Sequence, residues 1–238
     1  MNEKYIKNFD FAESFVGTND SAACSKFKLL IDIIDFDGIT NIVDFGCRFA
    51  ENSIEMSILF PNATVHGIEP VPESYAICCE KHETLSSDIK NRIHLYNFAV
   101  SNKSEPITFY VGNDPAVSSK YNFIPNMNGT WWGKGWEMTP VTVMAMTLDD
   151  WKTDHNIGPI DVMWVDVQGG ELDAFMGAVQ TLKDVKIIMT EMGTTAYYEG
   201  QSLRPEINSY LNSQGFEELP NSWVSGHPYE GDVIYIRK

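Results

Sequence analysis

Two acidic residues that follow two short apolar runs indicate where this chain could do chemistry. Asp44 follows the first run and is itself followed by Gly46, and Glu69 ends the second run. A glycine turn with an acidic residue roughly 20 positions further on is typical of a nucleoside site at the carboxyl edge of a parallel sheet. There the glycine lets the backbone approach the ligand, and the carboxylate binds the ribose hydroxyls. The spacing therefore predicts a nucleoside-binding site.

The glycine turn separates two classes of nucleoside cofactor. Dinucleotide-binding folds use Gly-x-Gly-x-x-Gly, whose extra glycines let a pyrophosphate lie on the helix N-terminus. Here Gly46 is followed by Cys47, Arg48, Phe49 and Ala50, with no second glycine. A ligand without a pyrophosphate needs fewer close approaches of the backbone. The turn therefore favours S-adenosylmethionine over NAD.

Two more carboxylates follow apolar runs later in the chain, at Asp166 and Glu191. Because ligands of open α/β sheets bind beyond the carboxyl ends of the strands, we expect Asp44, Glu69, Asp166 and Glu191 to gather at one edge. Any one of them alone could be a solvated strand-end acid. Together they place Asp166 and Glu191 where the catalytic general base for methyl transfer to a hydroxyl would be.

A divalent metal is the alternative explanation for part of this acidic set. Asp166, Glu171 and Glu191 would offer the carboxylate oxygens that Mg²⁺ prefers. Glu171 is equally well explained as a favourable charge in the first turn of a helix. We therefore expect a site without a required metal.

Aromatic residues in two segments could bind an acceptor. Trp131, Trp132 and Trp136 are interleaved with glycines, and Tyr197 follows the strand that ends in Glu191. Such rings could stack on a sugar or another flat acceptor, while the glycines would let the segment move. The alternative is a loop held on the core by its apolar rings.

The elements that must position these residues alternate between strands and helices. This order predicts one mostly parallel central sheet flanked by helices on both faces. Apolar runs and spacing predict strands at 42–45, 64–68, 93–98, 107–111, 141–146, 160–167, 185–190 and 232–236. They predict helices at 21–35, 52–59, 72–85, 171–182 and 204–213 and the start of one at 148–151.

The same reading divides the chain into two parts. Residues 1–40 would form an N-terminal arm and a helix, because residues 1–20 show no clear periodicity, and this part could serve as a lid. Residues 41–238 would form a single domain with an insertion loop around 112–140, a length usually reserved for functional loops.

Charge and cysteine content narrow the partners. The formal net charge is -16, which disfavours phosphate backbones and anionic lipid, so we expect no nucleic acid and no membrane partner. No apolar run approaches the roughly 18 residues of a membrane span, and the first residues lack a signal-peptide core. The four cysteines form no Cys-x-x-Cys pair, which suits a reducing cytoplasm.

Four segments together resemble the FkbM-type methyltransferases, a family of S-adenosylmethionine-dependent O-methyltransferases. The resemblance covers about residues 40–192, and its most specific part is similar to the family's Leu-Asp-Asp … Asp-x-Glu-Gly-x-Glu pattern. The segments are VDFGCRFAENS at 43–53, GIEPVPESY at 67–75, NFAVS at 97–101, and TLDDW at 147–151 running into IDVMWVDVQGGEL at 160–172. The implied fold is the Rossmann-like class I methyltransferase fold.

The resemblance also implies roles for individual residues. Asp44 and Gly46 would shape the methionine end of the cofactor site, Glu69 would hold the ribose, and Asp166 would frame the floor near the reacting methyl with Gly169 and Glu171. The complete cofactor-binding set expected on this basis is Asp44, Gly46, Cys47, Glu69, Pro70, Asn97, Ala99 and Asp166.

Two positions depart from the family pattern. Ala50 stands where the family usually has glycine, which tightens the turn, and Gln168 stands where it usually has glutamate. The second change removes one charge from the floor of the site, and it argues against a metal-binding version.

The leading hypothesis is an O-methyltransferase acting on a hydroxyl of a small molecule or glycan. N-methylation of a small amine is the runner-up among enzymes, since an amine needs a weaker base. A nucleoside-binding module without catalysis is the alternative from another class, and a dinucleotide oxidoreductase comes third because the turn lacks its glycines.

Overall fold

The structure is a computed structural model that describes residues 3–16, 22–124, 135–227 and 229–238. Its central sheet has the strand order β10-β11-β8-β7-β1-β2-β3. Five neighbouring strands run parallel: β3 (Ile93–Tyr96), β2 (Thr64–Ile68), β1 (Asn41–Phe45), β7 (Val162–Val165) and β8 (Ile187–Gly193). The next strand, β11 (Glu230–Arg237), lies beside β8 and is antiparallel to it. Two short strands, β9 (Phe216–Glu218) and β10 (Val224–His227), pair with the other side of β11.

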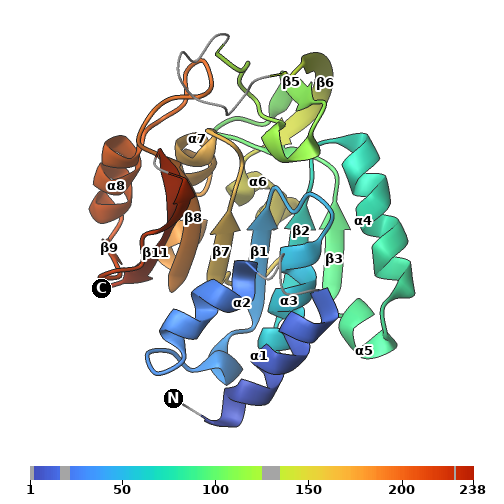
Figure 1. Ribbon diagram of the computed structural model, residues 1–238, viewed down its shortest axis with the longest axis vertical. Helices are drawn as coiled ribbons and strands as arrows, with labels where there is room; N and C mark the ends of the chain where they lie inside the picture. Colours follow the sequence, from blue (N-terminus) through green and yellow to red (C-terminus); the bar gives the residue numbers. More distant parts are fainter. Residues whose placement is uncertain (1–2, 17–21, 125–134, 228) are drawn as a thin grey trace.

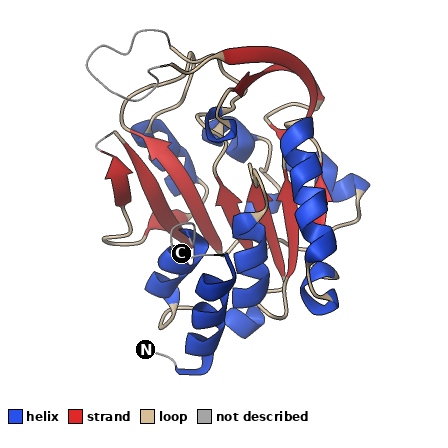
Figure 2. Ribbon diagram, turned by 45° about the vertical axis from the view of Figure 1, so that its right-hand side comes forward, coloured by secondary structure: helices blue, strands red, loops and turns tan. Residues whose placement is uncertain are grey.

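Helices cover both faces of this sheet, as Figures 1 and 2 show. One face carries α1 (Glu3–Val16), α2 (Ala22–Phe27) and α3 (Glu51–Leu59), and the other carries α6 (Leu148–Asp154), α7 (Glu171–Met176) and α8 (Arg204–Ser213). Beside β3 lies α4 (Pro72–Thr84), followed by the short α5 (Ser87–Lys90). The predicted α/β class with a mostly parallel sheet is therefore confirmed.

Strand residues alternate between two hydrophobic cores. Ile42 and Trp164 point to the core that includes α1, α2 and α3, whereas Val43 and Val165 point to the core that includes α6, α7 and α8. This alternation follows from the two-residue period of a strand. It explains why the central strands read as nearly continuous apolar runs, since both of their faces are buried.

A second, three-stranded sheet lies above the carboxyl edge of the first, where the arrowheads of β1, β2 and β7 end (Figure 1). It consists of β4 (Ala99–Val100), β6 (Met138–Met146) and β5 (Glu105–Gly112). The insertion expected around 112–140 connects β5 to β6, and residues 125–134 within it lie outside the described residues. The sequence predicted β5 and β6 but not their separation from the main sheet.

The N-terminal segment differs from the expected irregular arm, because residues 3–16 form α1. Tyr5, Phe9 and Ala12 are buried at a spacing of four and three residues, which is a helical period that the sequence reading missed. The helix predicted over 21–35 is also shorter, since it breaks into α2 and a 3₁₀ turn, Lys28–Leu30. Whether the N-terminal part acts as a lid stays a prediction.

The helix predicted over 171–182 ends early, at Met176. Gly177 follows, where a Cβ would lie only 2.1 Å from the Ser101 carbonyl oxygen. Gly177 caps the helix, and a separate 3₁₀ turn, Thr181–Lys183, follows.

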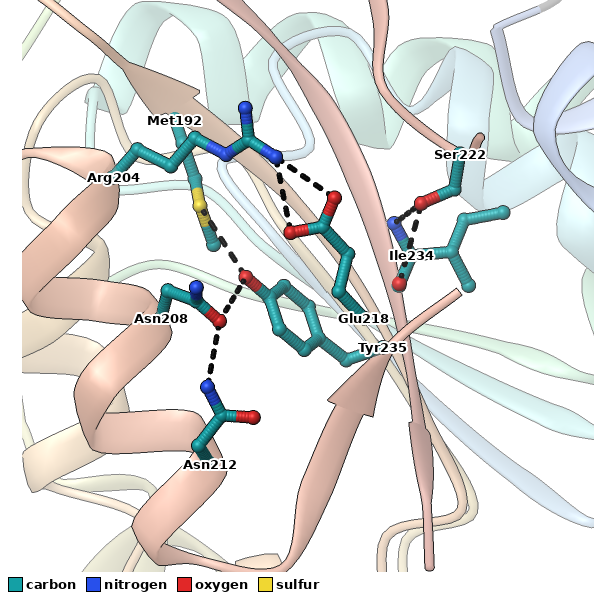
Figure 3. Close-up of polar contacts among 8 residues, drawn as sticks. All are labelled: Met192, Arg204, Asn208, Asn212, Glu218, Ser222, Ile234 and Tyr235. Atoms are coloured by element: carbon teal, nitrogen blue, oxygen red, sulfur yellow. Dashed lines mark hydrogen bonds and ion pairs between the residues drawn. The ribbon is translucent and has the colours of Figure 1, made fainter. Parts of the chain in front are cut away.

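The C-terminal strands are tied to α8 by polar contacts (Figure 3). Arg204 Nη2 donates to both carboxylate oxygens of Glu218, at 2.8 and 3.0 Å. The hydroxyl of the buried Tyr235 lies 3.3 Å from Asn208 Oδ1. Ser222 Oγ accepts from the Ile234 backbone at 3.1 Å. These contacts fix the antiparallel edge that closes the sheet next to β8.

The opposite, amino-terminal edge of the sheet is held by Asp161. Its Oδ2 accepts from Thr40 N, Thr40 Oγ1 and Asn41 N at 2.7, 2.9 and 3.1 Å, and its Oδ1 lies 2.7 Å from Lys186 Nζ. One carboxylate thus joins the starts of β1, β7 and β8. In the described part of the chain, we find no helix with the length and apolar character needed to cross a bilayer.

Candidate cofactor and acceptor site

A cavity of about 820 Å³ opens at the carboxyl edge of the sheet. Loops after β1, β2, β7 and β8 form its floor, and the second sheet and its 3₁₀ turn, Pro115–Val117, form its roof. Most of the predicted site residues line it, namely Gly46, Cys47, Glu69, Pro70, Ala99, Trp136, Asp166, Glu191 and Tyr197. The structure therefore brings together residues that lie far apart in the sequence.

The turn after β1 is built around Gly46, whose φ is +75°. A Cβ at this position would lie 2.0 Å from the Asp166 carbonyl oxygen, so only glycine lets β1 and the β7 loop approach this closely. The Gly46 and Cys47 backbone amides donate to Ile68 O at 3.0 and 3.1 Å. Ala50, at the position where the related family usually has glycine, still adopts a left-handed φ of +65°. The tight turn predicted from the sequence thus forms without a second glycine.

Glu69 is buried, and its carboxylate is held from two sides. Oε2 accepts from Arg48 N and Oε1 from Val71 N, both at 2.9 Å. Burial raises the pKa of Glu69 to about 7, against the lowering effect of these two amides. Each oxygen keeps a further lone pair, so Glu69 can still accept hydrogen bonds from a diol at the cavity.

Two predicted cofactor residues support the site from behind and do not line the cavity. Asp44 is fully buried beneath the turn, where Ser53 Oγ donates to its Oδ2 at 2.5 Å, and burial raises its pKa to about 7. Asn97 Nδ2 donates to the carbonyl oxygens of Glu69 and Pro70, at 2.8 and 3.2 Å. Both residues therefore shape the loops that carry the lining residues.

The two expected catalytic carboxylates are joined by Gln168. Gln168 Nε2 donates to Asp166 Oδ1 and to Glu191 Oε2, both at 2.8 Å. Burial raises the pKa of Asp166 to about 6, while the Gln168 bond lowers it. Burial, followed by the charge of Asp166, holds the pKa of Glu191 well above its usual range. The sequence identified Gln168 as unusual but could not show that it bridges the pair.

Glu171 has a different role from the other carboxylates. Its Oε1 accepts from Val167 N and Gly169 N, at 3.2 and 3.0 Å, and the side chain is buried. It therefore stabilises the turn after β7 from within. Among residues 3–16, 22–124, 135–227 and 229–238, no three His, Cys, Asp or Glu side chains lie close enough to form a metal site.

The predicted aromatic acceptor residues fall into two groups. Trp131 and Trp132 lie outside the described residues. Trp136 and Tyr197 line the cavity, and the Trp136 ring meets Phe123 edge-on at 5.0 Å. Tyr198, which follows Tyr197 and could be part of the acceptor wall or of the packing, also lines the cavity, and its hydroxyl donates to Gln168 Oε1 at 3.0 Å. One wall of the cavity is thus aromatic.

The cavity wall is strongly acidic. Besides Asp166 and Glu191, five more lining residues are carboxylates: Glu13, Glu51, Glu69, Asp114 and Glu230. Among the described residues, the cations that line the cavity are Arg48 and Lys120, and Lys120 is paired with Asp173. This excess of negative charge suits a cationic ligand such as a sulfonium and opposes an anionic one.

Known protein families can be compared with this geometry. A family model described as the methyltransferase FkbM domain matches residues 44–218, which include every floor element of the cavity. The chain belongs to the FkbM methyltransferase family. The predicted family and the prediction of a methyltransferase enzyme are thereby confirmed.

Individual relatives agree with this membership. The 2-O-methyltransferase NoeI of Sinorhizobium fredii (strain NBRC 101917 / NGR234) is 29% identical over 198 residues, which are 81% of this chain and 77% of NoeI. A methyltransferase FkbM structure from Methylobacillus flagellatus KT has a TM-score of 0.54 at 12% identity, and the match covers 98% of this chain and 59% of that one. An O-methyltransferase from Bacillus cereus, solved with SAH, gives the same TM-score and identity over 98% and 91%. At this identity the two structures show the fold alone, the class I methyltransferase fold that was predicted.

Proposed function

We propose that this protein transfers the methyl group of S-adenosylmethionine to a hydroxyl of a small molecule or glycan. The observation that carries the proposal is the shared cavity: Glu69 lies on one side of its floor and the Asp166–Glu191 pair on the other. The similarity to a protein named as a 2-O-methyltransferase supports oxygen as the methylated atom.

The residues present fit this cofactor. Gly46 gives the backbone a close turn that a Cβ would fill, and the buried Glu69 presents a carboxylate to the cavity. Gly46, Cys47, Glu69, Pro70 and Ala99 would hold the nucleoside and methionine parts, with Asp44 and Asn97 supporting them. When bound, S-adenosylmethionine supplies an activated methyl group on a cationic sulfur.

The protein's own contribution is to position the acceptor and to take its proton. Asp166 and Glu191 line the cavity and are the carboxylates that can accept a proton from an acceptor hydroxyl. Their raised pKa values make them stronger bases than ordinary carboxylates once they are ionised. Trp136 and Tyr197 would hold the acceptor against the aromatic wall.

Net charge and cysteine content support proposals about the acceptor and the location of the protein. The net charge of -16 and the acidic cavity support a neutral small-molecule or glycan acceptor, and they oppose a nucleic acid or an anionic membrane surface. The four free cysteines support a reducing location, and we propose the cytoplasm. A metal is not part of this proposal.

A methyl-transfer assay tests the acceptor atom. The protein is incubated with S-adenosylmethionine labelled in its methyl group and with matched panels of hydroxylated glycosides, other small alcohols and small amines. Label on oxygen supports the proposal, and label on nitrogen supports the N-methyltransferase alternative. An Asp166→Asn, Glu191→Gln double variant separates them further, because an O-methyltransferase should lose nearly all turnover while amine methylation should largely persist, with cofactor binding as the control.

A further inference from the structure

The side chain of Gln168 is the least expected polar group in the cavity, because it lies between two carboxylates. Its amide nitrogen donates to Asp166 and to Glu191 at the same distance, 2.8 Å. Its oxygen, Oε1, accepts from the Tyr198 hydroxyl at 3.0 Å. The reverse orientation would turn the amide oxygen toward two carboxylates, so the surrounding groups determine which end faces which.

The backbone around Gln168 is shaped to place this amide. Gln168 has a left-handed φ of +52°, a conformation that is uncommon for a residue with a side chain, and Gly169 follows with +94°. Ser119 Oγ donates to Gln168 O at 2.7 Å, and Gly169 N donates to Glu171 at 3.0 Å. A strained residue held from two sides is typical of a functional position.

Two carboxylates this close to one hydrogen-bond donor would otherwise repel each other. In a partly buried place such a pair normally takes up a proton or binds a cation. The amide of Gln168 instead offers one hydrogen to each carboxylate and adds no charge. Both carboxylates line the cavity and can therefore present negative charge to it.

We infer that Gln168 is a positioning residue that replaces a bound cation between Asp166 and Glu191. Its amide holds the two carboxylates in place without adding a charge, and Tyr198 keeps the amide in its orientation. The pair then attracts the cationic cofactor of the proposed function, on which this last step rests. In a chain with glutamate at 168, the same place would hold three carboxylates and would need a cation.

Substitution of Gln168 tests the inference without any acceptor. Gln168→Glu should lower the thermal midpoint by about 5 °C in a chelator-containing buffer, and millimolar Mg²⁺ should restore most of it. Gln180→Glu is the matched control, because it adds the same charge at an exposed glutamine. The wild type and the control should respond to Mg²⁺ only weakly and alike. An unperturbed Gln168→Glu midpoint, or an equally strong Mg²⁺ response of the wild type, would overturn the inference.

A second variant measures the role toward the cofactor. Gln168→Met keeps the size of the side chain but offers no hydrogen to either carboxylate. We expect the ratio of affinities for S-adenosylmethionine and the neutral S-adenosylhomocysteine, measured by calorimetry, to fall about 3- to 10-fold. An equal loss for both ligands, or no loss, would mean that Gln168 only supports the fold.

The two experiments also separate this inference from the proposed function. If wild-type protein binds neither sulfur nucleoside, the proposed cofactor is wrong, and the Mg²⁺ response of Gln168→Glu still decides whether the amide replaces a cation. If Gln168→Glu does not fold, Gln168→Met should show a lowered midpoint that Mg²⁺ raises, and a wild-type midpoint in that variant would overturn the inference.

Discussion

Gly46 shows how one residue can determine the shape of a site. Its φ is left-handed, and a Cβ would lie 2.0 Å from the Asp166 carbonyl oxygen, so there is no room for any side chain. The backbone amides of Gly46 and Cys47 donate to Ile68 O and so join β1 to β2 at the cavity floor. The apolar run before Gly46 marks the end of a strand, which is why the sequence predicted a turn at this position.

We predict that Gly46→Ala lowers the free energy of unfolding by about 3 kcal/mol, from combined backbone strain and a steric clash. Gly135→Ala is the matched control, since Gly135 also has a positive φ, +92°, but a Cβ there would meet no atom of the described residues within 4 Å. The control should lose only about 1 kcal/mol. Urea unfolding of both variants measures the difference, and equal losses would show that the clash with Asp166 is absent.

The residues that the sequence could not place are those whose position depends on tertiary contacts. Gln168 bridges two carboxylates only because Gly169 and Ser119 fold the β7 loop back, which no local pattern records. Asp44, by contrast, was expected at the ligand but lies beneath the turn with Ser53. Strand-end position predicted the edge of the sheet correctly and left the direction of each side chain open.

At the scale of elements, strands and helices followed the hydrophobic pattern closely. The central strands β1, β2, β7 and β8 lie where the apolar runs predicted them. The pattern missed α1, whose buried Tyr5 and Phe9 are separated by Ile6, Lys7 and Asn8. It also could not show that β5 and β6 leave the main sheet, because an alternating strand reads the same in either sheet.

Asp161 is the element-scale contact most open to test. Burial raises its pKa, but Lys186 and the Thr40 and Asn41 donors outweigh that effect and hold the pKa below its usual range. Asp161→Ala should lower the free energy of unfolding by about 2 kcal/mol, because it removes the charged acceptor of the Thr40 and Asn41 backbone amides. Lys186→Met should cost less than about 1 kcal/mol, since that side chain is 56% exposed. Similar losses in the two urea titrations would contradict this account.

The whole molecule carries an unusual number of buried carboxyl groups. Burial raises the pKa values of Asp44, Glu55, Glu69 and Glu171 to about 7. The folded state therefore binds more protons than the unfolded chain between about pH 4 and 7. The stability that these groups contribute falls across this range and is lost once the pH has risen through 7. His66 has the opposite effect on the pH dependence of stability. Burial lowers its pKa to about 4, so the stability that it contributes is present at neutral pH and is lost as the pH falls toward 4.

We predict that the stability of the ligand-free protein falls steadily between about pH 5 and 8, with a loss on the order of 2 kcal/mol between pH 6.5 and 8. Urea unfolding at several pH values measures this loss. Glu55→Gln should flatten the curve without touching the cavity, because Glu55 contacts the backbone of Ala23 at the start of α2. A wild-type stability that is constant or rises between pH 6.5 and 8 would contradict the raised pKa values.

Cofactor binding by Glu69 is the claim on which the proposed function depends. Calorimetric titration with S-adenosylmethionine, S-adenosylhomocysteine and NAD would test it on the wild type, on Glu69→Ala and on Glu73→Ala, an exposed control on α4. We predict saturable binding of the two sulfur nucleosides, weakened about 10- to 100-fold in Glu69→Ala and unchanged in the control. Binding of NAD alone, or equal affinities in all three proteins, would contradict it.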